Sequence, residues 1–195
     1  MIAPVTYDRN FPGEYAAGVF FRLLWQTLPW EKREGAPRRE AWFNPYGEPY
    51  TYGQGEHART YQANGLPRHP KDCNASFHIR CVMNALNAKF ESQYDCCFVN
   101  GYENGRQHLG WHSDDSPEMD MDHPIATVSL GAAREIWFRP KERDANLEPE
   151  KLMLANGSVA IMAAGMQRDW QHRIPKSSVA DCGPRISLTY RKLVR

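Results

Sequence analysis

The 195-residue sequence contains no apolar run of the roughly 18 residues that a transmembrane helix requires. Its first residues, Met1 to Pro4, do not form a basic segment followed by a hydrophobic stretch, so no signal peptide is indicated. These absences predict an intracellular protein that is not secreted and not membrane-bound, cytoplasmic and, in a eukaryote, also nuclear. Internal repeats and low-complexity stretches are missing as well, and one domain is expected at this length. The sequence does not specify an oligomeric state, and a monomer is the working expectation.

Cysteine is scarce and its spacing excludes two common uses. The five cysteines are odd in number and include no Cys-x-x-Cys pair, so neither a zinc module nor a disulfide framework is indicated. Cys96 and Cys97 are adjacent and would point to opposite faces of a strand. Reduced, mostly buried thiols in an intracellular protein are the simplest interpretation.

A charge excess of either sign is also missing, because 24 Lys and Arg nearly balance 23 Asp and Glu and leave a net charge of +1. An obligate DNA binder would be more basic, so a nucleic-acid partner would need a local basic patch. Four groups of basic residues are candidates for such a patch: Lys32, Arg33, Arg38 and Arg39; Arg68, His69 and Lys71; Arg134, Arg139, Lys141 and Arg143; Arg168, Arg173 and Lys176. Each group alone is typical of a solvated face, and only convergence on one site would make a binding surface.

The chain has a helical and loop-rich first part. Apolar residues at helical spacing predict a helix over residues 14–28 that ends before Pro29, and its apolar positions are Phe20, Leu23, Leu24 and Leu28. A second helix is predicted to begin after Asn74 as N-cap, with an apolar stripe of Ile79, Val82, Met83, Leu86 and Phe90. The intervening residues 30–73 are rich in Pro, Gly and charge, which predicts loops with short strands.

After residue 93 the pattern changes to short β-runs, predicted at 94–102, 108–112, 125–130, 134–138, 151–155, 158–163, 168–173 and 185–192. Asn156-Gly157 is a tight-turn signal between two of them. Short strands with turn signals predict a mainly β protein with some helix (α+β), built on a double-sheet jelly roll. We place the jelly-roll core at 93–195 and assign residues 1–92 to the same domain. Trp137 and Trp170 are expected in the core.

The sequence Trp-His-Ser-Asp-Asp at 111–115 places His112 and Asp114 two residues apart. In an extended segment such a pair projects to one face and offers two neighbouring ligands to a divalent metal. His172 can complete a set of two His and one carboxylate, which is the facial triad of non-haem Fe(II) oxygenases. Zinc accepts the same ligands, and a short His-x-Asp motif recurs by chance, so the pair alone decides neither metal nor function.

The run from Arg185 to Arg191 alternates cleanly between polar and apolar residues. Arg185, Ser187, Thr189 and Arg191 share one face of the predicted strand. An Arg at each end suits a dicarboxylate, because the planar guanidinium meets a carboxylate in a bidentate manner. By itself the segment is more typical of an edge strand with a solvated basic face.

Taken together, these motifs resemble the AlkB family of Fe(II)- and 2-oxoglutarate-dependent nucleic-acid dealkylases. The resemblance rests on His112-x-Asp114, on His172, and on Arg185 and Arg191 six residues apart, and it covers about residues 37–193. Asn100-Gly-Tyr102 and residues 125–131 also resemble the family, and residues 169–176 and the lid-like residues 45–52 are similar to the eukaryotic homologues that repair DNA and RNA. The chain departs from the family at Ser187, where Asn is usual.

The resemblance implies a double-stranded β-helix buttressed by helices, with residues 1–92 supplying a nucleotide-recognition lid. It implies Fe(II) on His112, Asp114 and His172, with 2-oxoglutarate and O₂ as co-substrates. The implied 2-oxoglutarate contacts are Asn100, Tyr102, Arg185, Ser187 and Arg191. The implied substrate is an alkylated nucleic acid, DNA or RNA, of N1-methyladenine or N3-methylcytosine type, with single strands slightly favoured because no apolar finger loop is evident.

The substrate contacts are the least specified part of the site. A base that is modified must leave the stack and enter a pocket with aromatic walls. By resemblance, Tyr52 and the His112 ring are the candidate walls, Tyr50 and Trp42 are secondary candidates, and Asp115 faces the base. A packed β-strand for Tyr50 and Tyr52, and a solvated acidic loop for Asp115, compete with these roles.

Three other functions stay open at this point. A 2-oxoglutarate oxygenase could act on a protein side chain or a small molecule instead of a base. A non-catalytic nucleic-acid-binding module would keep the fold but need no complete ligand set. A zinc hydrolase would use the triad but gives no reason for the Arg185 and Arg191 pair.

Overall fold

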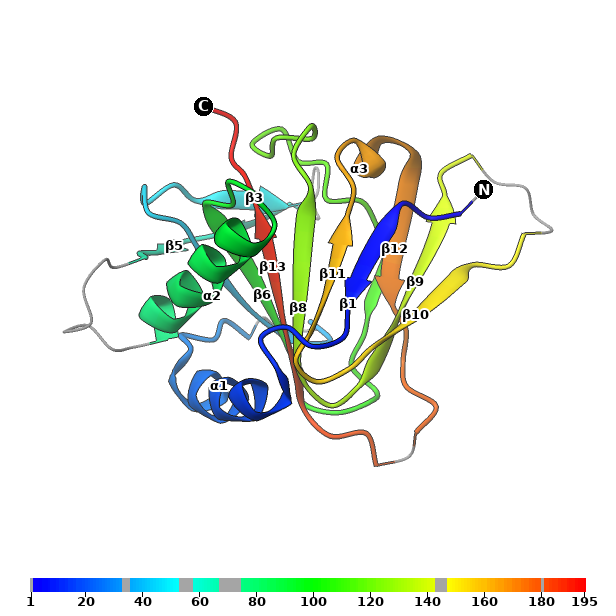
Figure 1. The fold of residues 1–195 in the computed structure, drawn as a ribbon, viewed down its shortest axis with the longest axis horizontal. Coiled ribbons are helices and arrows are strands. Elements are labelled where there is room, and N and C mark those ends of the chain that lie inside the picture. The colour runs from blue at the N-terminus through cyan, green and yellow to red at the C-terminus, as the bar shows by residue number, and fades with distance from the viewer. Residues whose placement is uncertain (1, 33–35, 53–57, 67–74, 143–146, 180) are drawn as a thin grey trace.

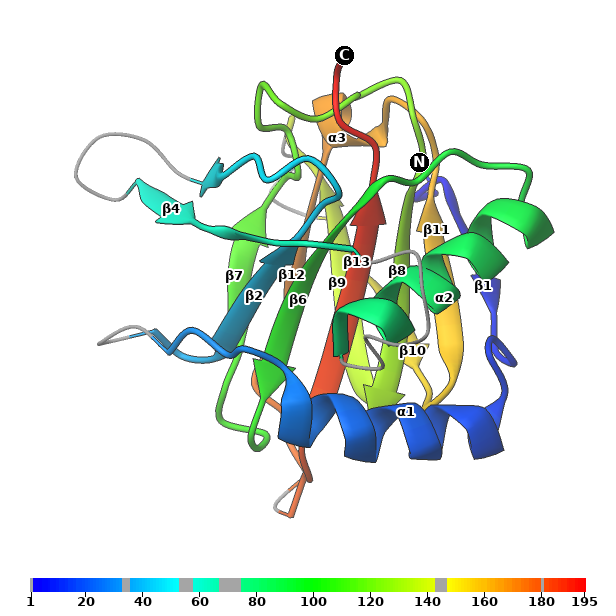
Figure 2. The ribbon, with the colours of Figure 1, turned by 90° about the vertical axis from the view of Figure 1, so that its left-hand side faces the viewer.

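The computed structural model describes residues 2–32, 36–52, 58–66, 75–142, 147–179 and 181–195. Two β-sheets face each other, and two helices cover the far side of the larger sheet (Figure 1). The larger sheet has seven strands in the order β1-β11-β8-β13-β6-β2-β5, and the smaller has four in the order β10-β9-β12-β7. A separate hairpin, β3 with β4, extends to one side at the end of the sandwich (Figure 2).

The strands of the larger sheet are β1 (Val5–Asp8), β2 (Arg39–Phe43), β5 (Ala63–Asn64), β6 (Cys96–Tyr102), β8 (Ile125–Gly131), β11 (Ser158–Met162) and β13 (Arg185–Arg191). Those of the smaller sheet are β7 (Leu109–His112), β9 (Arg134–Pro140), β10 (Glu150–Leu154) and β12 (Trp170–Ile174). The hairpin consists of β3 (Tyr50–Tyr52) and β4 (Arg59–Tyr61). The double-sheet arrangement confirms the predicted jelly roll.

The two predicted helices are present, and both pack on the larger sheet. Helix α1 (Glu14–Thr27) ends two residues before Pro29, where a following proline disfavours helical geometry. Helix α2 (Ala75–Lys89) buries its predicted stripe of Ile79, Val82, Met83 and Leu86 against the sheet. Phe90 follows the last helical residue and packs partly buried on the same core. The proposed N-cap, Asn74, lies outside the described residues.

Strand β13 lies in the interior of the larger sheet, between β6 and β8. Its apolar residues Ile186, Leu188 and Tyr190 join the core under the helices. The opposite, polar face is also buried and points between the two sheets, with Arg185 fully inaccessible. A solvated edge strand is therefore excluded, and the cost of burying two arginines demands partners inside the sandwich.

Sequence and structure differ in several elements. Strand β1 was not predicted, although it pairs with β11 along its whole length. The predicted strand 168–173 begins as a short helix, α3 (Met166–Asp169), before β12. The expectation for Trp170 is confirmed, since its side chain joins the core between the sheets. The expectation for Trp137 is wrong, because this side chain lies half-buried on the outer face of the smaller sheet.

The N-terminal part of the chain contributes directly to the sandwich. Strand β1 forms one margin of the larger sheet, and β2 pairs with β6 beside the predicted co-substrate residues. Cys96 and Cys97 are both buried, on opposite faces of β6, as the sequence predicted. Within the described ranges, no helix has the length and apolarity to cross a bilayer.

Candidate metal and co-substrate site

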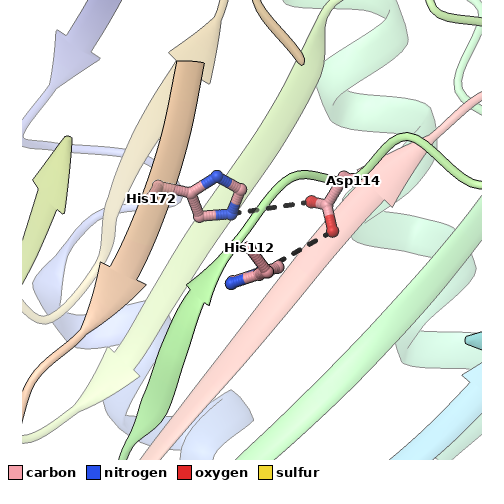
Figure 3. A group of neighbouring side chains, drawn as sticks. All are labelled: His112, Asp114 and His172. Atoms are coloured by element: carbon pink, nitrogen blue, oxygen red, sulfur yellow. Dashed lines mark ion pairs between the residues drawn. The ribbon is translucent and has the colours of Figure 1, made fainter. Parts of the chain in front are cut away.

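The structure brings His112, Asp114 and His172 together, with one ligand atom of each within 4.8 Å of the others. His112 ends β7 and lies directly opposite His172 of β12 in the smaller sheet. The Nε2 atoms of both rings lie 3.8 Å from the Asp114 carboxylate, each nearer to a different oxygen. Figure 3 shows the two rings and the carboxylate converging, an arrangement that suits a divalent cation.

Asp114 does not project by strand alternation alone, because β7 ends at His112. The following residues are fixed against the start of β12 and against α3. Ser113 donates its hydroxyl hydrogen to the Trp170 carbonyl (2.9 Å), and the Asp114 amide donates to Gln167 Oε1 (2.9 Å). Two hydrogen bonds from outside the strand therefore hold the carboxylate toward the rings.

The protonation states favour metal binding. His112 Nδ1 lies 2.9 Å from the Gly110 carbonyl, which can only accept, so Nδ1 carries the hydrogen and Nε2 is free as a ligand. Burial lowers the pKa of both imidazoles, that of His172 to about 3, so neutral rings are the resting form. Burial alone would raise the pKa of Asp114, but the interactions with Arg191 and the two histidines lower it by a larger amount. The net pKa is therefore below its ordinary value, and the carboxylate stays ionised.

Arg191 is the nearest cation to this carboxylate, with Nη2 2.6 Å from Asp114 Oδ1. Burial disfavours its guanidinium charge, but the Asp114 carboxylate outweighs that and raises the pKa of Arg191. Arg191 Nη1 also donates to the Tyr50 hydroxyl at 3.3 Å. Asp114 Oδ2 and Arg191 Nε are buried without a hydrogen-bond partner among the described residues.

Arg185 occupies the other end of the polar face of β13, directly opposite Tyr102 of β6. Its Nε donates to Ser129 Oγ at 2.9 Å and its Nη2 to Ser187 Oγ at 3.3 Å. Burial lowers the pKa of Arg185 to about 10, which still leaves the side chain cationic at neutral pH. Within the described part of the chain, Arg185 Nη1 and the Tyr102 hydroxyl are buried with no hydrogen-bond partner.

These unsatisfied groups test whether the residues present fit a metal and a keto acid. Buried polar atoms are normally paired, so several orphans in one place indicate a missing ligand. The metal side has an orphan carboxylate oxygen, and the strand face has orphan donors at Tyr102, Arg185 and Arg191. An acceptor-rich anion between the arginines and a cation between the histidines would satisfy both sets. The donor chemistry therefore fits Fe(II) with 2-oxoglutarate.

The sequence missed a buried network next to this site. Asn100 Oδ1 accepts a hydrogen bond of 2.7 Å from Arg38 Nε, and Arg38 is ion-paired with Glu40. Glu40, only 1% exposed, also accepts from the Tyr61 hydroxyl at 2.7 Å. Residues 30–73 gave no regular alternation, so the inward direction of Arg38, Glu40 and Tyr61 had no periodic signal. Arg38 was noted only as a member of a basic cluster.

Two hollows meet at Tyr52 and His112. A small cavity of about 20 Å³ lies on the inner side, bordered by the triad carboxylate, Arg191 and the Arg38–Glu40 pair. An open groove of about 690 Å³ lies on the outer side. The rings of Tyr52 and His112 are edge-to-face, with centroids 6.3 Å apart and planes at 85°. These two rings thus separate the cavity from the groove.

The other predicted substrate residues have different environments. Trp42 is 1% exposed and packs against Tyr50, with ring centroids 5.0 Å apart, so it lies behind Tyr50 in the core and its contact with a base stays a prediction. Tyr50 is also buried, but it borders the small cavity and contacts Arg191. Asp115 borders the open groove, with its carboxylate 2.9 Å from Lys141 Nζ and a side chain 45% exposed.

The basic clusters do not all converge on this site. Arg38 borders the small cavity and Lys141 borders the groove. Arg168 instead pairs with Asp122 at the surface, and Arg134 is buried under the loop carbonyls of Gln107 and Pro175. Arg33, Arg68, His69, Lys71 and Arg143 lie outside the described residues.

Comparison with known proteins gives the same assignment. The sequence profile of the 2OG-Fe(II) oxygenase superfamily matches residues 5–191. The chain is 32% identical over 185 residues to human "Alpha-ketoglutarate-dependent dioxygenase alkB homolog 3", covering 86% of this chain and 58% of that protein. It is 29% identical over 186 residues to "DNA oxidative demethylase ALKBH2" from Bos taurus, covering 93% of this chain and 60% of that protein.

The chain thus spans about three fifths of the length of these relatives. A solved structure titled "The structure of OsALKBH1" shares the fold, with a TM-score of 0.61 and 18% identity over 98% of this chain and 99% of that one. The profile match covers nearly the whole chain, including every residue of the triad and both arginines of β13. The protein therefore belongs to the 2OG-Fe(II) oxygenase superfamily, and within it to the AlkB family.

Proposed function

We propose that the protein is an Fe(II)- and 2-oxoglutarate-dependent dioxygenase that oxidatively demethylates alkylated bases in DNA, RNA or both. Its substrates would be of the N1-methyladenine and N3-methylcytosine type, with release of formaldehyde, succinate and CO₂ in direct-reversal alkylation repair. One observation carries the proposal: a buried His-Asp-His triad adjoins two buried arginines with unsatisfied donors, behind an aromatic wall. The relative named as a DNA oxidative demethylase supports this reaction, and the one named as an alpha-ketoglutarate-dependent dioxygenase supports the co-substrate.

In this proposal His112, Asp114 and His172 hold Fe(II), which supplies the O₂ chemistry when bound. The chain's own contribution is to keep both imidazoles neutral and the carboxylate ionised before the metal arrives. Arg191, 2.6 Å from Asp114, would fix the rotamer of that carboxylate and partly offset its negative charge. The site is buried, so bulk water is excluded from the reacting atoms.

Arg185, with Tyr102 and Ser187 beside it, would bind the distal carboxylate of 2-oxoglutarate. Arg191 and Asn100 would hold the carboxylate nearer to the metal. Charge-assisted hydrogen bonds of this kind are about twice as strong as neutral ones and orient the keto acid. Arg38 donates to the Asn100 side-chain oxygen, which leaves the Asn100 amide hydrogens free for an acceptor.

A methylated base would enter from the groove and pass between Tyr52 and His112. The cavity behind Tyr52, about 20 Å³, has room for about one water molecule, so Tyr52 must turn aside to admit a base. Asp115 stands at the groove and would favour a base that methylation has made cationic. Tyr50 borders the same cavity and accepts a hydrogen bond from Arg191.

Three accompanying expectations belong to the proposal. The narrow entrance at Tyr52 favours a flipped-out or single-stranded base, since unpairing then costs least. A monomer suffices, because the triad and all five co-substrate residues come from one chain. The protein would work inside the cell, where nucleic acid is available. The division into residues 1–92 and 93–195 would separate a lid-bearing part from the catalytic core of one domain.

The test is incubation with Fe(II), 2-oxoglutarate and a panel of methylated oligonucleotides, read by product mass and formaldehyde release. Loss of one methyl mass from N1-methyladenine or N3-methylcytosine is the expected result. If 2-oxoglutarate is consumed but no base loses a methyl group, the substrate is a protein or small molecule and the repair function is wrong. Stimulation of 2-oxoglutarate turnover by oligonucleotide, and not by free metabolites, separates the same alternatives.

A matched pair of variants separates catalysis from binding alone. His172→Ala removes a proposed metal ligand and should abolish formaldehyde release while oligonucleotide binding persists. His108→Ala removes a histidine whose only described contact is the Arg106 carbonyl, and activity should be kept. Full activity in His172→Ala would overturn the metal assignment, and zinc-supported activity without 2-oxoglutarate would favour a hydrolase.

A further inference from the structure

The outer face of the smaller sheet carries a continuous stack of alternating aromatic rings and cations. Trp111 comes from β7, Arg173 from β12, Trp137 from β9 and Lys151 from β10, in the order of the strands in the sheet. The Arg173 Cζ atom lies 4.7 Å from the Trp111 ring centroid and 4.2 Å from that of Trp137, and Lys151 Nζ lies 4.5 Å from the Trp137 centroid. We call these four residues the ladder.

Strand register builds the ladder. Arg173 is the direct cross-strand partner of Trp137, and Trp137 is the direct partner of Lys151, so all three point to the same face. Trp111 joins them because it precedes His112, the partner of His172, and so points away from His112 as Arg173 points away from His172. The irregular pairing between His172 and Ile174 then allows Leu109 to face inward with His112. Arg139 also stacks on Trp111, with Cζ 4.2 Å from the ring centroid.

The ladder cations are not neutralised. Among the described residues, neither Arg173 nor Lys151 has a carboxylate within ion-pairing distance. Glu135, a carboxylate on this face, accepts a 2.9 Å hydrogen bond from the Trp137 indole. The ladder therefore presents excess positive charge, held in place by stacking instead of by ion pairs.

The ladder begins at the groove of the proposed active site. Trp111 borders the groove, as do Lys141 and Gln171, and Trp111 is the residue before His112. From there the ladder crosses four strands, a span of about 14 Å at normal sheet spacing. In Figure 1 this sheet lies on the side of the molecule away from α1 and α2. A chain that leaves the groove over Trp111 would follow the ladder toward Lys151.

We propose that the ladder binds the sugar-phosphate backbone of the nucleic acid whose methylated base enters the groove. This inference rests on the proposed function for the identity of the polymer. The backbone is the partner, and not a base, because stacked cations already cover the ring faces of Trp137 and Trp111. A row of unpaired cations complements a row of phosphates, and stacking has already restricted their rotamers before the polymer binds.

The test measures binding without catalysis. The full chain is titrated into a fluorescein-labelled single-stranded oligodeoxythymidine, and the dissociation constant is read from anisotropy at several salt concentrations. The double variant Arg173→Gln/Lys151→Gln should bind roughly tenfold more weakly at low salt, and its log–log salt slope should fall by about 1.4, or 0.7 for each lost phosphate. Trp137→Leu keeps the charges, so it should weaken binding less and leave the slope unchanged.

The matched control removes the same charge elsewhere. Arg9→Gln/Arg22→Gln removes the charges of two exposed arginines away from the groove, one between β1 and α1 and the other in α1. Its affinity and salt slope should stay near those of the wild type. Equal weakening in both double variants would mean a general charge effect and overturn the ladder. So would unchanged binding in Arg173→Gln/Lys151→Gln, which would make the stack a purely structural feature of the sheet.

Failure of the ladder and failure of the proposed function are distinguishable. Formaldehyde release from a methylated trinucleotide reports the reaction alone, because so short a substrate cannot follow the ladder. Release from the trinucleotide with unchanged polymer binding would leave demethylation standing and remove the ladder. Ladder-dependent binding with no release from any substrate would leave a nucleic-acid surface and remove demethylation. A thermal unfolding curve for each variant identifies any that is misfolded, and Lys151→Gln alone, at an exposed position, then replaces the double variant.

Discussion

The ion pair between Asp114 and Arg191 gives the sharpest prediction, because the two side chains are only 3% and 6% exposed. At their N–O distance of 2.6 Å, two unit charges attract by about 6 kcal/mol at an effective dielectric constant near 20. Desolvation offsets much of this attraction, yet removing one partner leaves the other charge buried, which costs about 3–5 kcal/mol. We expect Asp114→Asn to destabilise the metal-free protein by that amount, or roughly 6–20 °C in unfolding midpoint.

The comparison that isolates burial is Asp8→Asn. Asp8 and Lys89 also lie 2.6 Å apart, but their side chains are 30% and 46% exposed, so this pair should contribute at most about 1 kcal/mol. The asparagine introduced at position 8 keeps a side-chain oxygen that can accept the hydrogen bond from the Asn10 backbone amide, so this bond is retained. Urea unfolding in EDTA measures both variants, and Asp114→Asn/Arg191→Met should recover part of the loss. Equal, small losses in Asp114→Asn and Asp8→Asn would refute the reasoning.

Three further predictions concern the same site. Mn(II), added anaerobically, should raise the unfolding midpoint of the wild type but not that of His172→Ala, and EDTA should reverse the shift. Stabilisation of both proteins by Mn(II) would show that the metal binds elsewhere. Tyr102→Phe should raise the KM for 2-oxoglutarate by about 10- to 150-fold, because one hydrogen bond to a charged group is lost. The stability of the metal-free protein should not fall, since the Tyr102 hydroxyl has no hydrogen-bond partner in the described chain. A lower unfolding midpoint of the variant would show that the hydroxyl does have a partner. The metal-free protein should lose stability as the pH falls from 6.5 toward about 3, because buried His172 stays neutral while the unfolded chain takes up a proton, and His172→Gln should flatten that dependence in urea titrations.

Periodicity predicted those parts of the molecule in which one face is apolar. The stripe of α2 and the alternation of β13 each face a single core, so their patterns were legible. Strand β2 was not, because both of its faces carry buried apolar residues: Ala41 and Phe43 point to the helices, while Trp42 points inward beside Glu40. A strand with apolar residues on both faces lacks a polar–apolar alternation, and the charged residues at its start read as a loop.

The site itself was predicted in part for the wrong physical reason. Spacing of i and i+2 suggested that His112 and Asp114 share a face of one strand, but the strand ends at His112, and Gln167 and Ser113 orient the carboxylate. Simple alternation would also have placed Trp111 inward with Leu109, whereas the bulge places Leu109 and His112 inward together. Gly110 within the run was the available signal, since glycine in a strand often marks a bulge.

Ser187 illustrates how the structure accommodates a departure that the sequence alone left unexplained. Its hydroxyl is too short to reach beyond Arg185, and instead accepts from Nη2 of that guanidinium at 3.3 Å. Ser129 accepts from Nε at 2.9 Å, so two serines hold two edges of the planar group and leave Nη1 without a partner. A side chain held on two edges has little rotamer freedom left to lose. Arg185 Nη1 and the Tyr102 hydroxyl therefore remain without partners on neighbouring strands, and in the proposed function the distal carboxylate of 2-oxoglutarate would bind both.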